Sequence, residues 1–120
     1  MKRILIADDE PSVRSFFRAV LERAGYTVFE AGNGREAFQQ AHTEKVDLLI
    51  TDLVMPEQEG IETIRALRAD SPGIAIIAIS GAFGGEFLKI ARLLGADAVL
   101  AKPVSPSVLL SQVAEVLSRR

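Results

Sequence analysis

Short apolar runs alternate along the chain with stretches in which apolar residues recur every three or four positions. The runs predict five strands, at residues 3–7, 27–31, 46–51, 74–79 and 97–101. The first, third and fourth runs are almost continuously apolar, which is typical of strands buried on both faces of a parallel sheet. The pattern therefore indicates an α/β fold in which a helix follows each strand.

Apolar stripes with the helical period lie between and after these strands. The first consists of Val13, Phe16, Phe17, Val20 and Leu21. We interpret Phe16 and Phe17 as core aromatics, because they belong to this stripe, and not as a platform for stacking bases. A weaker stripe predicts a second helix at about residues 34–43. The later stripes are Ile61, Ile64 and Leu67, then Phe87, Ile90, Ala91 and Leu94, and finally Leu109, Val113 and Val116.

Five βα units with short connections predict right-handed crossovers and a parallel sheet with helices on both faces. The 120 residues contain no linker or internal repeat, so we predict one domain, 1–120, with a doubly wound (βα)5 architecture. A complete single-domain protein and a domain cut from a longer chain would both fit this pattern.

Composition narrows the range of partners. Apolar residues make up 48% of the chain, charged residues 25%, and the net charge is −2, so we do not expect direct binding to nucleic acid. No apolar stretch approaches the roughly 20 residues that cross a bilayer, and none resembles a signal-peptide core, so we expect no membrane insertion. The chain has no cysteine, which excludes disulfides and thiolate metal sites. We therefore expect a cytoplasmic protein.

Polar side chains follow four of the five predicted strands, at the edge where an open parallel sheet binds its ligands. The second strand leads only to Ala31 and Gly32. The residues at the other four strand ends are Asp8, Asp9, Asp52, Ser80 and Lys102. Each alone has an ordinary explanation, such as a helix cap or a solvated lysine. Their joint occurrence at one edge favours a functional site.

The three carboxylates predict a metal ion. At separations of about 5–6 Å and an effective dielectric constant of about 20, each pair would repel by about 3 kcal/mol. A divalent cation would remove this repulsion. Carboxylate ligands without histidine or cysteine favour Mg²⁺.

A metal ion beside a carboxylate, a hydroxyl group and a lysine is suited to phosphoryl transfer. The metal and the ammonium group would neutralise the phosphoryl oxygens, and a carboxylate can be the nucleophile. Asp52 is the best candidate for that nucleophile, because it ends the central strand and precedes Met55-Pro56.

These residues resemble the receiver domain of bacterial two-component response regulators, especially the single-domain, chemotaxis-regulator-like members. The resemblance covers all 120 residues and is carried by "DDEP" at 8–11, "TDLVMP" at 51–56, "MPEQEG" at 55–60 and "GADAVLAKP" at 95–103. It implies a flavodoxin-like fold with a five-stranded parallel sheet of order 2-1-3-4-5. It also implies that Gly60 opens the third helix.

The resemblance assigns a role to each metal ligand. Asp9 and Asp52 would bind Mg²⁺ directly, and the backbone carbonyl group of Val54 would be the third protein ligand. Asp8 would act through a metal-bound water molecule.

The resemblance also assigns the residues that handle the phosphoryl group. Asp52 would be phosphorylated, Lys102 would pair with the phosphoryl group, and Ser80 would supply the hydroxyl group. The Lys102–Pro103 peptide bond would be cis. Many receivers have Tyr or Phe as a switch three residues before the lysine, but this chain has Val99. The signal would then pass through the loop at 80–86, or coupling would be weak.

The implied function is a phosphorylation-dependent signalling switch. A sensor histidine kinase or a histidine phosphotransfer protein would donate the phosphoryl group in a Mg²⁺-dependent, self-catalysed step. The changed surface would bind a downstream effector protein, and the domain would not be a turnover enzyme. The alternatives are a phosphorylation-independent interaction module and, less favoured, an aspartyl-nucleophile Mg²⁺ phosphatase. Such phosphatases generally place nucleophile and acid two residues apart, whereas Asp8 and Asp9 are adjacent.

Overall fold

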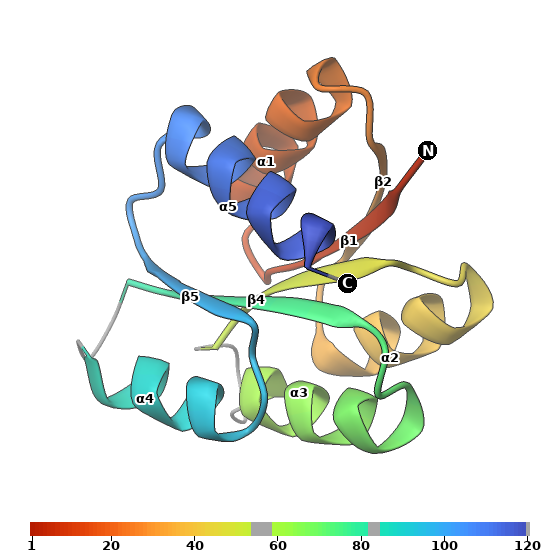
Figure 1. Ribbon diagram of the computed structural model, residues 1–120, viewed down its shortest axis with the longest axis vertical. Coiled ribbons are helices and arrows are strands. Elements are labelled where there is room, and N and C mark those ends of the chain that lie inside the picture. The colour runs from red at the N-terminus through yellow and green to blue at the C-terminus, as the bar shows by residue number, and fades with distance from the viewer. Residues whose placement is uncertain (54–58, 82–84, 120) are drawn as a thin grey trace.

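The computed structural model places five parallel strands in one central sheet, with helices on both faces (Figure 1). The structure describes residues 1–53, 59–81 and 85–119. The strand order is β2-β1-β3-β4-β5, which confirms the predicted order. The strands are β1 (Arg3–Ala7), β2 (Thr27–Ala31), β3 (Leu48–Asp52), β4 (Ala75–Ser80) and β5 (Ala98–Ala101).

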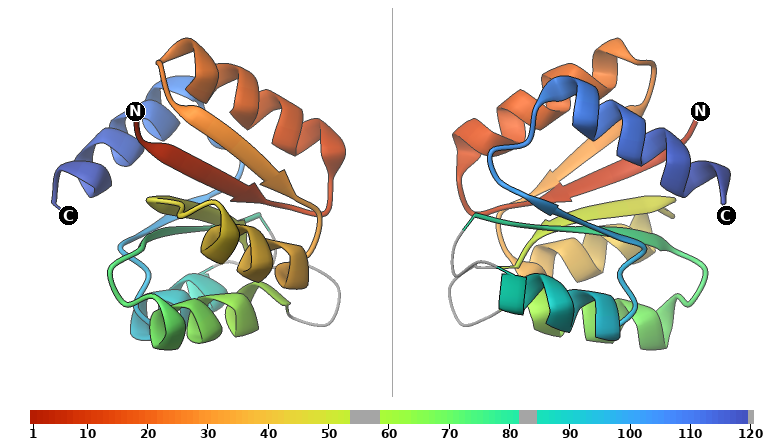
Figure 2. Two further views of the ribbon diagram at one scale, coloured as in Figure 1. Left: turned by 90° about the vertical axis from the view of Figure 1, so that its right-hand side faces the viewer. Right: turned by 60° about the vertical axis from the view of Figure 1, so that its left-hand side comes forward.

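One helix follows each strand, as predicted. The helices are α1 (Pro11–Arg23), α2 (Gly34–Thr43), α3 (Glu59–Asp70), α4 (Gly85–Leu93) and α5 (Pro106–Ser118). Helices α1 and α5 lie on one face of the sheet, and α2, α3 and α4 lie on the other (Figures 1 and 2). Across the described ranges, no helix combines the length and apolar character needed to cross a membrane.

Alternate residues of each central strand supply two separate hydrophobic cores. In β1, Ile4 and Ile6 pack in the core beneath α1 and α5, whereas Leu5 and Ala7 pack in the core beneath the other three helices. All four side chains are almost completely buried. This two-sided burial explains why the strands are continuously apolar in sequence.

The bounds of three strands, β3, β4 and β5, differ from the prediction. Strand β3 begins at Leu48 and includes Asp52, and β4 is displaced by one residue so that it includes Ser80. Val46 is buried, but its N–H donates to the Ala41 carbonyl group and closes the turn after α2. The carboxylates of Asp47 and Asp97 accept backbone N–H groups of neighbouring strands, so both residues precede their strands.

The prediction that Phe16 belongs to the core is wrong. Phe17 of α1 is 4% exposed and packs in the core between this helix and the sheet. Phe16 is 44% exposed, because it lies at the margin of the apolar stripe. Ile90 of α4 is likewise 42% exposed, while its neighbour Ala91 is buried. A periodic stripe thus identifies the buried face of a helix better than it identifies the edge of that face.

Arg68 joins two connections at the amino ends of the strands, the one between α3 and β4 and the one between α4 and β5. Its guanidinium group donates to the carbonyl oxygens of Pro72, Ile74 and Gly95 and to the carboxylate of Asp97, with 2.9 Å between Nη2 and Asp97 Oδ2. Gly95 has a φ of +107°, and an added Cβ there would lie 2.9 Å from Arg68 Nε. This Arg68 cluster therefore fixes the end of α4 against α3.

Arg68→Met should lower the free energy of unfolding by about 2–3 kcal/mol, because the partly buried carbonyl groups of Ile74 and Gly95 and the carboxylate of Asp97 would lose this donor. Urea unfolding followed by circular dichroism would measure this loss. The control is Arg65→Met, at an exposed position on the same helix, which should change the stability by less than about 0.5 kcal/mol. Equal effects of the two substitutions would contradict the importance of the cluster.

A second ionic cluster joins α1 to β2. One carboxylate oxygen of Glu30 lies 3.0 Å from Arg14 Nε, and the other lies 2.8 Å from Arg18 Nη1. The Arg18 hydrogen bond is the main cause that lowers the pKa of Glu30. A carboxyl group with a lowered pKa stabilises the folded state above its unfolded pKa, and that contribution is lost as the pH falls through the folded pKa.

Glu30→Gln should therefore destabilise the domain by about 0.5–1 kcal/mol at pH 7, and the difference should disappear in acid. The loss should begin near the ordinary glutamate pKa of about 4.3 and be complete below the lowered folded pKa. Unfolding titrations from pH 7 to pH 3 would show it. Glu22→Gln, which removes only the exposed pair between Arg18 and Glu22, should have a smaller effect. A pH-independent effect of Glu30→Gln would contradict the ionic explanation.

Candidate functional site

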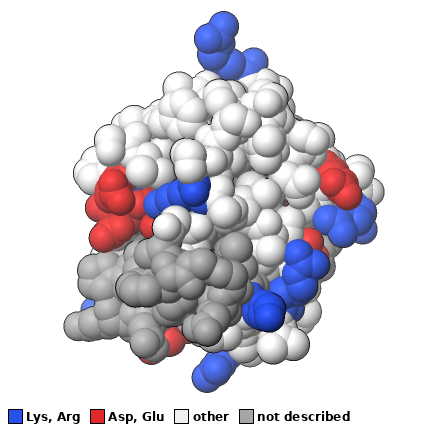
Figure 3. Space-filling model, turned by 90° about the vertical axis from the view of Figure 1, so that its left-hand side faces the viewer, with Lys and Arg blue, Asp and Glu red and all other residues white. Residues whose placement is uncertain are grey.

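The carboxyl ends of β1, β3, β4 and β5 meet at one edge of the sheet (Figures 1 and 2). Asp8 follows β1, Asp52 ends β3, Ser80 ends β4, and Lys102 follows β5. The space-filling view of this face shows acidic side chains gathered beside a basic one (Figure 3). The structure therefore brings together residues that the sequence separates widely.

Lys102 lies between two buried carboxylates. Its Nζ atom is 2.9 Å from Asp52 Oδ2 and 3.2 Å from Asp8 Oδ2. Asp8 is 2% exposed and Asp52 is 6% exposed, so both interactions are shielded from water. The resemblance assigned Lys102 to the phosphoryl group. In this structure its ammonium group pairs with the two carboxylates.

Burial and charge move two pKa values in this site. Burial raises the pKa of Asp8, although the Glu10 N–H and Lys102 partly oppose this rise. For Lys102, burial acts to lower the pKa, but the hydrogen bond and charge of Asp52 and the charge of Asp8 outweigh it, and the pKa is raised. The lysine is thus held in its charged form, while the carboxyl group of Asp8 ionises less readily than usual.

Backbone contacts fix the position of Lys102. Its N–H donates to the Ser80 carbonyl oxygen at 3.0 Å, which extends the pairing of β4 with β5 by one residue. A Cβ added at Gly81 would lie 2.9 Å from Lys102 Cβ, so the close approach requires glycine. The Lys102–Pro103 peptide bond is cis, as the resemblance implied. The Ser80 side chain is 4% exposed at the same edge.

Gly60 allows α3 to approach the end of β3. A Cβ there would lie 2.7 Å from Leu53 Cα and would overlap the carbonyl oxygen of Asp52. Gly60 is the second residue of α3, which confirms its expected place at the start of that helix. The helix therefore packs directly against the backbone of the predicted phosphoryl acceptor.

Asp8, Asp9 and Glu10 form a group whose carboxylate oxygens lie within 4.8 Å of one another. Glu10 occupies the N-cap of α1, but within the described part of the chain its side chain makes no capping hydrogen bond. The Asp8 carboxylate accepts the Glu10 N–H at 2.9 Å, so only capping by the Glu10 side chain is excluded for this group. Its oxygen-only donors fit a hard cation such as Mg²⁺. Val54, the predicted third ligand, lies outside the described residues.

Val99 is partly buried and packs in the core beneath α2, α3 and α4, opposite Ala78 of β4. The loop at 80–86, the expected route of the signal, falls partly outside the described residues.

Sequence reasoning missed Arg14, whose Nη1 atom donates to the Asp8 carbonyl oxygen at 2.6 Å.

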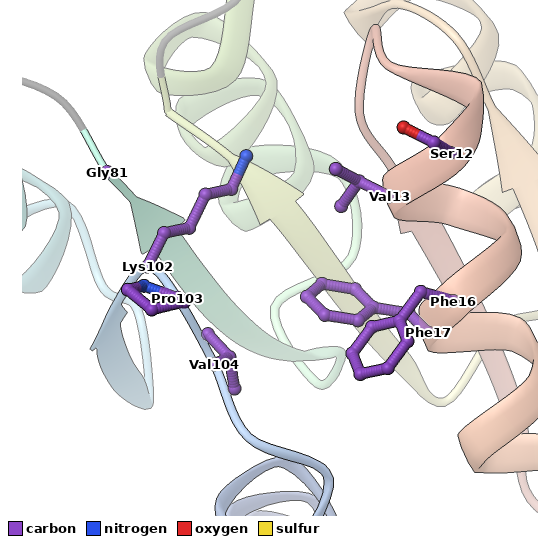
Figure 4. A pocket seen from close by; sticks show the side chains of 8 residues that line it. All are labelled: Ser12, Val13, Phe16, Phe17, Gly81, Lys102, Pro103 and Val104. Atoms are coloured by element: carbon purple, nitrogen blue, oxygen red, sulfur yellow. The ribbon is translucent and has the colours of Figure 1, made fainter.

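A groove of about 410 Å³ lies beside the site, between α1 and the segment that joins β5 to α5 (Figure 4). Its walls are mostly apolar. They consist of Ser12, Val13, Phe16, Phe17, Gly81, Lys102, Pro103 and Val104. The exposed side chain of Phe16 thus lines a groove that leads to Lys102.

Comparison with known proteins gives consistent matches. The protein-family model of the response regulator receiver domain matches residues 4–114. The chain is 40% identical over 119 residues to the alkaline phosphatase synthesis transcriptional regulatory protein PhoP of Bacillus subtilis, covering 98% of this chain but 49% of PhoP. It thus spans about half of PhoP's length. It is 36% identical over 120 residues to the chemotaxis protein CheY of Thermotoga maritima, covering 98% of this chain and 96% of CheY.

A solved structure also matches closely. The CheY-like response regulator receiver domain protein from Methanospirillum hungatei has a TM-score of 0.94 and 32% identity, over 99% of this chain and 95% of that chain. The strand order described above and this likeness agree on a flavodoxin-like fold.

Because Asp8 and Asp52 share Lys102, we expect a substitution at Asp8 to change the stability and the Mg²⁺ affinity in opposite directions. Asp8→Asn should raise the stability of the metal-free domain by about 1 kcal/mol, because one buried carboxylate would no longer compete with Asp52 for Lys102. The same substitution should weaken Mg²⁺ binding. Thermal unfolding with and without Mg²⁺ would measure both effects. A less stable metal-free variant would contradict this account of the site.

Proposed function

Because this chain belongs to the receiver domains of two-component response regulators, we propose that it is a phosphorylation-dependent signalling switch in which Asp52 accepts the phosphoryl group. The observation that carries this proposal is the position of Lys102, whose ammonium group lies 2.9 Å from Asp52 at the carboxyl edge of the sheet. A cation beside a nucleophilic carboxylate can neutralise the incoming phosphoryl oxygens.

The proposed step transfers a phosphoryl group from a histidine side chain to Asp52. A carboxylate oxygen of Asp52 forms a bond to phosphorus while the bond from phosphorus to the histidine nitrogen breaks, and the leaving imidazole takes up a proton. Lys102 then exchanges its contact with Asp52 for the phosphoryl oxygens. Ser80, at the end of the neighbouring strand, supplies a hydroxyl group to them.

Mg²⁺ would be held by Asp9, Asp52 and the Val54 carbonyl group, with Asp8 bound through water. When bound, it would neutralise the charge that develops on the phosphoryl oxygens. Glu10 adds a third carboxylate to the acidic group at the mouth of the site. The side chains of Asp9 and Glu10 are exposed, so an ion can approach from solvent.

The proposed activity is directed at the domain itself and is not that of a turnover enzyme. Asp8 and Asp9 are adjacent, and the Asp8 carboxylate is engaged by the Glu10 N–H and by Lys102. An aspartyl-nucleophile phosphatase would instead need an acid placed to protonate a leaving group. This engagement of Asp8 favours the switch.

We propose that the donor is a sensor histidine kinase or a histidine phosphotransfer protein that docks at the groove beside α1. The groove is apolar, contains the exposed Phe16 and leads to Lys102, so a docked side chain would meet the site (Figure 4). The output would be binding of a downstream effector protein in the cytoplasm. Because Val99 replaces the aromatic switch, we expect Ser80 and the segment after it to transmit the change.

The test uses amide NMR spectra of the domain with Mg²⁺, and then with Mg²⁺ and beryllofluoride, which stands in for the phosphoryl group. We expect Mg²⁺ to shift the resonances of Asp8, Asp9 and Glu10, and beryllofluoride to shift those of Ser80 and Lys102. Asp52→Asn should abolish the beryllofluoride response, because the acceptor oxygen is lost.

The outcomes separate the candidate functions. Mg²⁺ binding without any beryllofluoride response would overturn the switch and favour a phosphorylation-independent interaction module. A full response in Asp52→Asn would show that another residue is the acceptor. Phosphorylation by acetyl phosphate or phosphoramidate, measured by the mass increase of the intact domain, provides an independent readout.

A further inference from the structure

Arg14 joins the acidic loop to the edge strand of the sheet. From the first turn of α1, its Nη1 atom donates to the Asp8 carbonyl oxygen at 2.6 Å. Its Nε atom donates to Glu30 of β2 at 3.0 Å. The Arg14 side chain is 19% exposed. One guanidinium group thus serves two fixed partners.

The peptide groups around Asp8 are held from two directions. The Asp8 N–H donates to the Ala31 carbonyl oxygen of β2 at 3.1 Å, and the Asp8 carbonyl oxygen accepts from Arg14. The carbonyl group of Asp8 and the N–H of Asp9 belong to the same planar peptide unit. A donor that fixes the Asp8 oxygen therefore also fixes the plane from which the Asp9 backbone begins.

Glu30 keeps Arg14 in the orientation that this contact needs. It accepts from Arg14 with one oxygen and from Arg18 with the other, so its carboxylate is held by α1 at two points one turn apart. The guanidinium group is planar, and its donors have fixed directions. Binding of Nε to Glu30 therefore directs Nη1 towards the loop.

We propose that Arg14 is a positioning residue that sets the direction of the Asp8 and Asp9 carboxylates and thereby the affinity of the acidic group for Mg²⁺. The inference rests on the proposed function, because it assumes that these carboxylates hold the ion. Groups that orient metal ligands in this way typically change metal affinity by about 10–100-fold when they are removed.

Electrostatics alone predicts the opposite change in Mg²⁺ affinity when Arg14 is removed. A guanidinium group beside a cation site repels the incoming ion, so its removal should strengthen Mg²⁺ binding if charge were its only contribution. If Arg14 positions the loop, its removal should weaken Mg²⁺ binding despite the loss of repulsion. The direction of the change therefore distinguishes the two roles.

The experiment compares Arg14→Met with Arg18→Met. Both substitutions remove one positive charge from α1 and one hydrogen bond to Glu30, but only Arg14 contacts the Asp8 carbonyl group. Mg²⁺ affinity is measured by NMR titration of each domain. Hydrogen exchange of the Asp9 and Glu10 amides is measured without metal, and urea unfolding measures the stability of each variant.

We expect Arg14→Met to raise the Mg²⁺ dissociation constant on the order of tenfold and to speed exchange at Asp9 and Glu10. Arg18→Met should change the dissociation constant by less than about twofold, with a comparable loss of stability. Arg14→Lys keeps the charge but cannot hold both partners in the fixed directions of a guanidinium group. It should also weaken binding, and it replaces Arg14→Met if that variant does not fold.

Two failures are distinguishable. If the unmodified domain does not bind Mg²⁺, the proposed metal site is overturned. If the unmodified domain binds Mg²⁺ and Arg14→Met binds it equally or more tightly, the positioning role of Arg14 is overturned while the proposed function stands.

Discussion

The contact on which the site depends is the ammonium group of Lys102 between the carboxylates of Asp8 and Asp52. These residues lie 94 and 50 positions from Lys102 in the sequence, and the parallel sheet brings them together. Two buried carboxylates without a cation would repel one another strongly. Lys102 therefore allows Asp8 and Asp52 to lie close together at the carboxyl edge of the folded sheet.

The apolar interior makes this arrangement tolerable. The central strands contribute large side chains to two cores, and each fully buried Leu or Ile contributes about 1.5–3 kcal/mol. This stabilisation by the two cores offsets the free-energy cost of burying a few charged side chains at the edge of the sheet. Under the proposed function, this edge would accept a cation, and Lys102 would exchange one of its carboxylate partners for the phosphoryl oxygens.

Periodicity in the sequence predicted the layers, the strand order followed from the family resemblance, and the strand-end pattern predicted the site residues. Each of these depends on residues that differ in kind from their neighbours, such as Asp8 after the run Ile4-Leu5-Ile6-Ala7. Phe16 was misplaced because periodicity does not define the margin of a helix face. The strand ends at Asp52 and Ser80 shifted because hydrogen bonding, not polarity, decides where a strand stops.

Arg14 could not be found in this way. In the sequence it differs little from Arg18, since both are arginines one turn apart on α1. The contact that sets Arg14 apart is with the Asp8 carbonyl oxygen, whose position depends on how the loop leaves β1. The pairing of Lys102 with two carboxylates was hidden for a similar reason, because it depends on the register of β5 against β4.

The Arg68 cluster fixes the C-terminal end of α4. Its C-terminal end is fastened through Gly95 to α3, while its N-terminal end follows the strand that carries Ser80. Under the proposed function, a displacement at the carboxyl edge of the sheet would reach the N-terminal end of α4 first, while the Arg68 contacts hold the other end. Such a displacement would then change the angle of α4 and would not shift the whole helix along its axis.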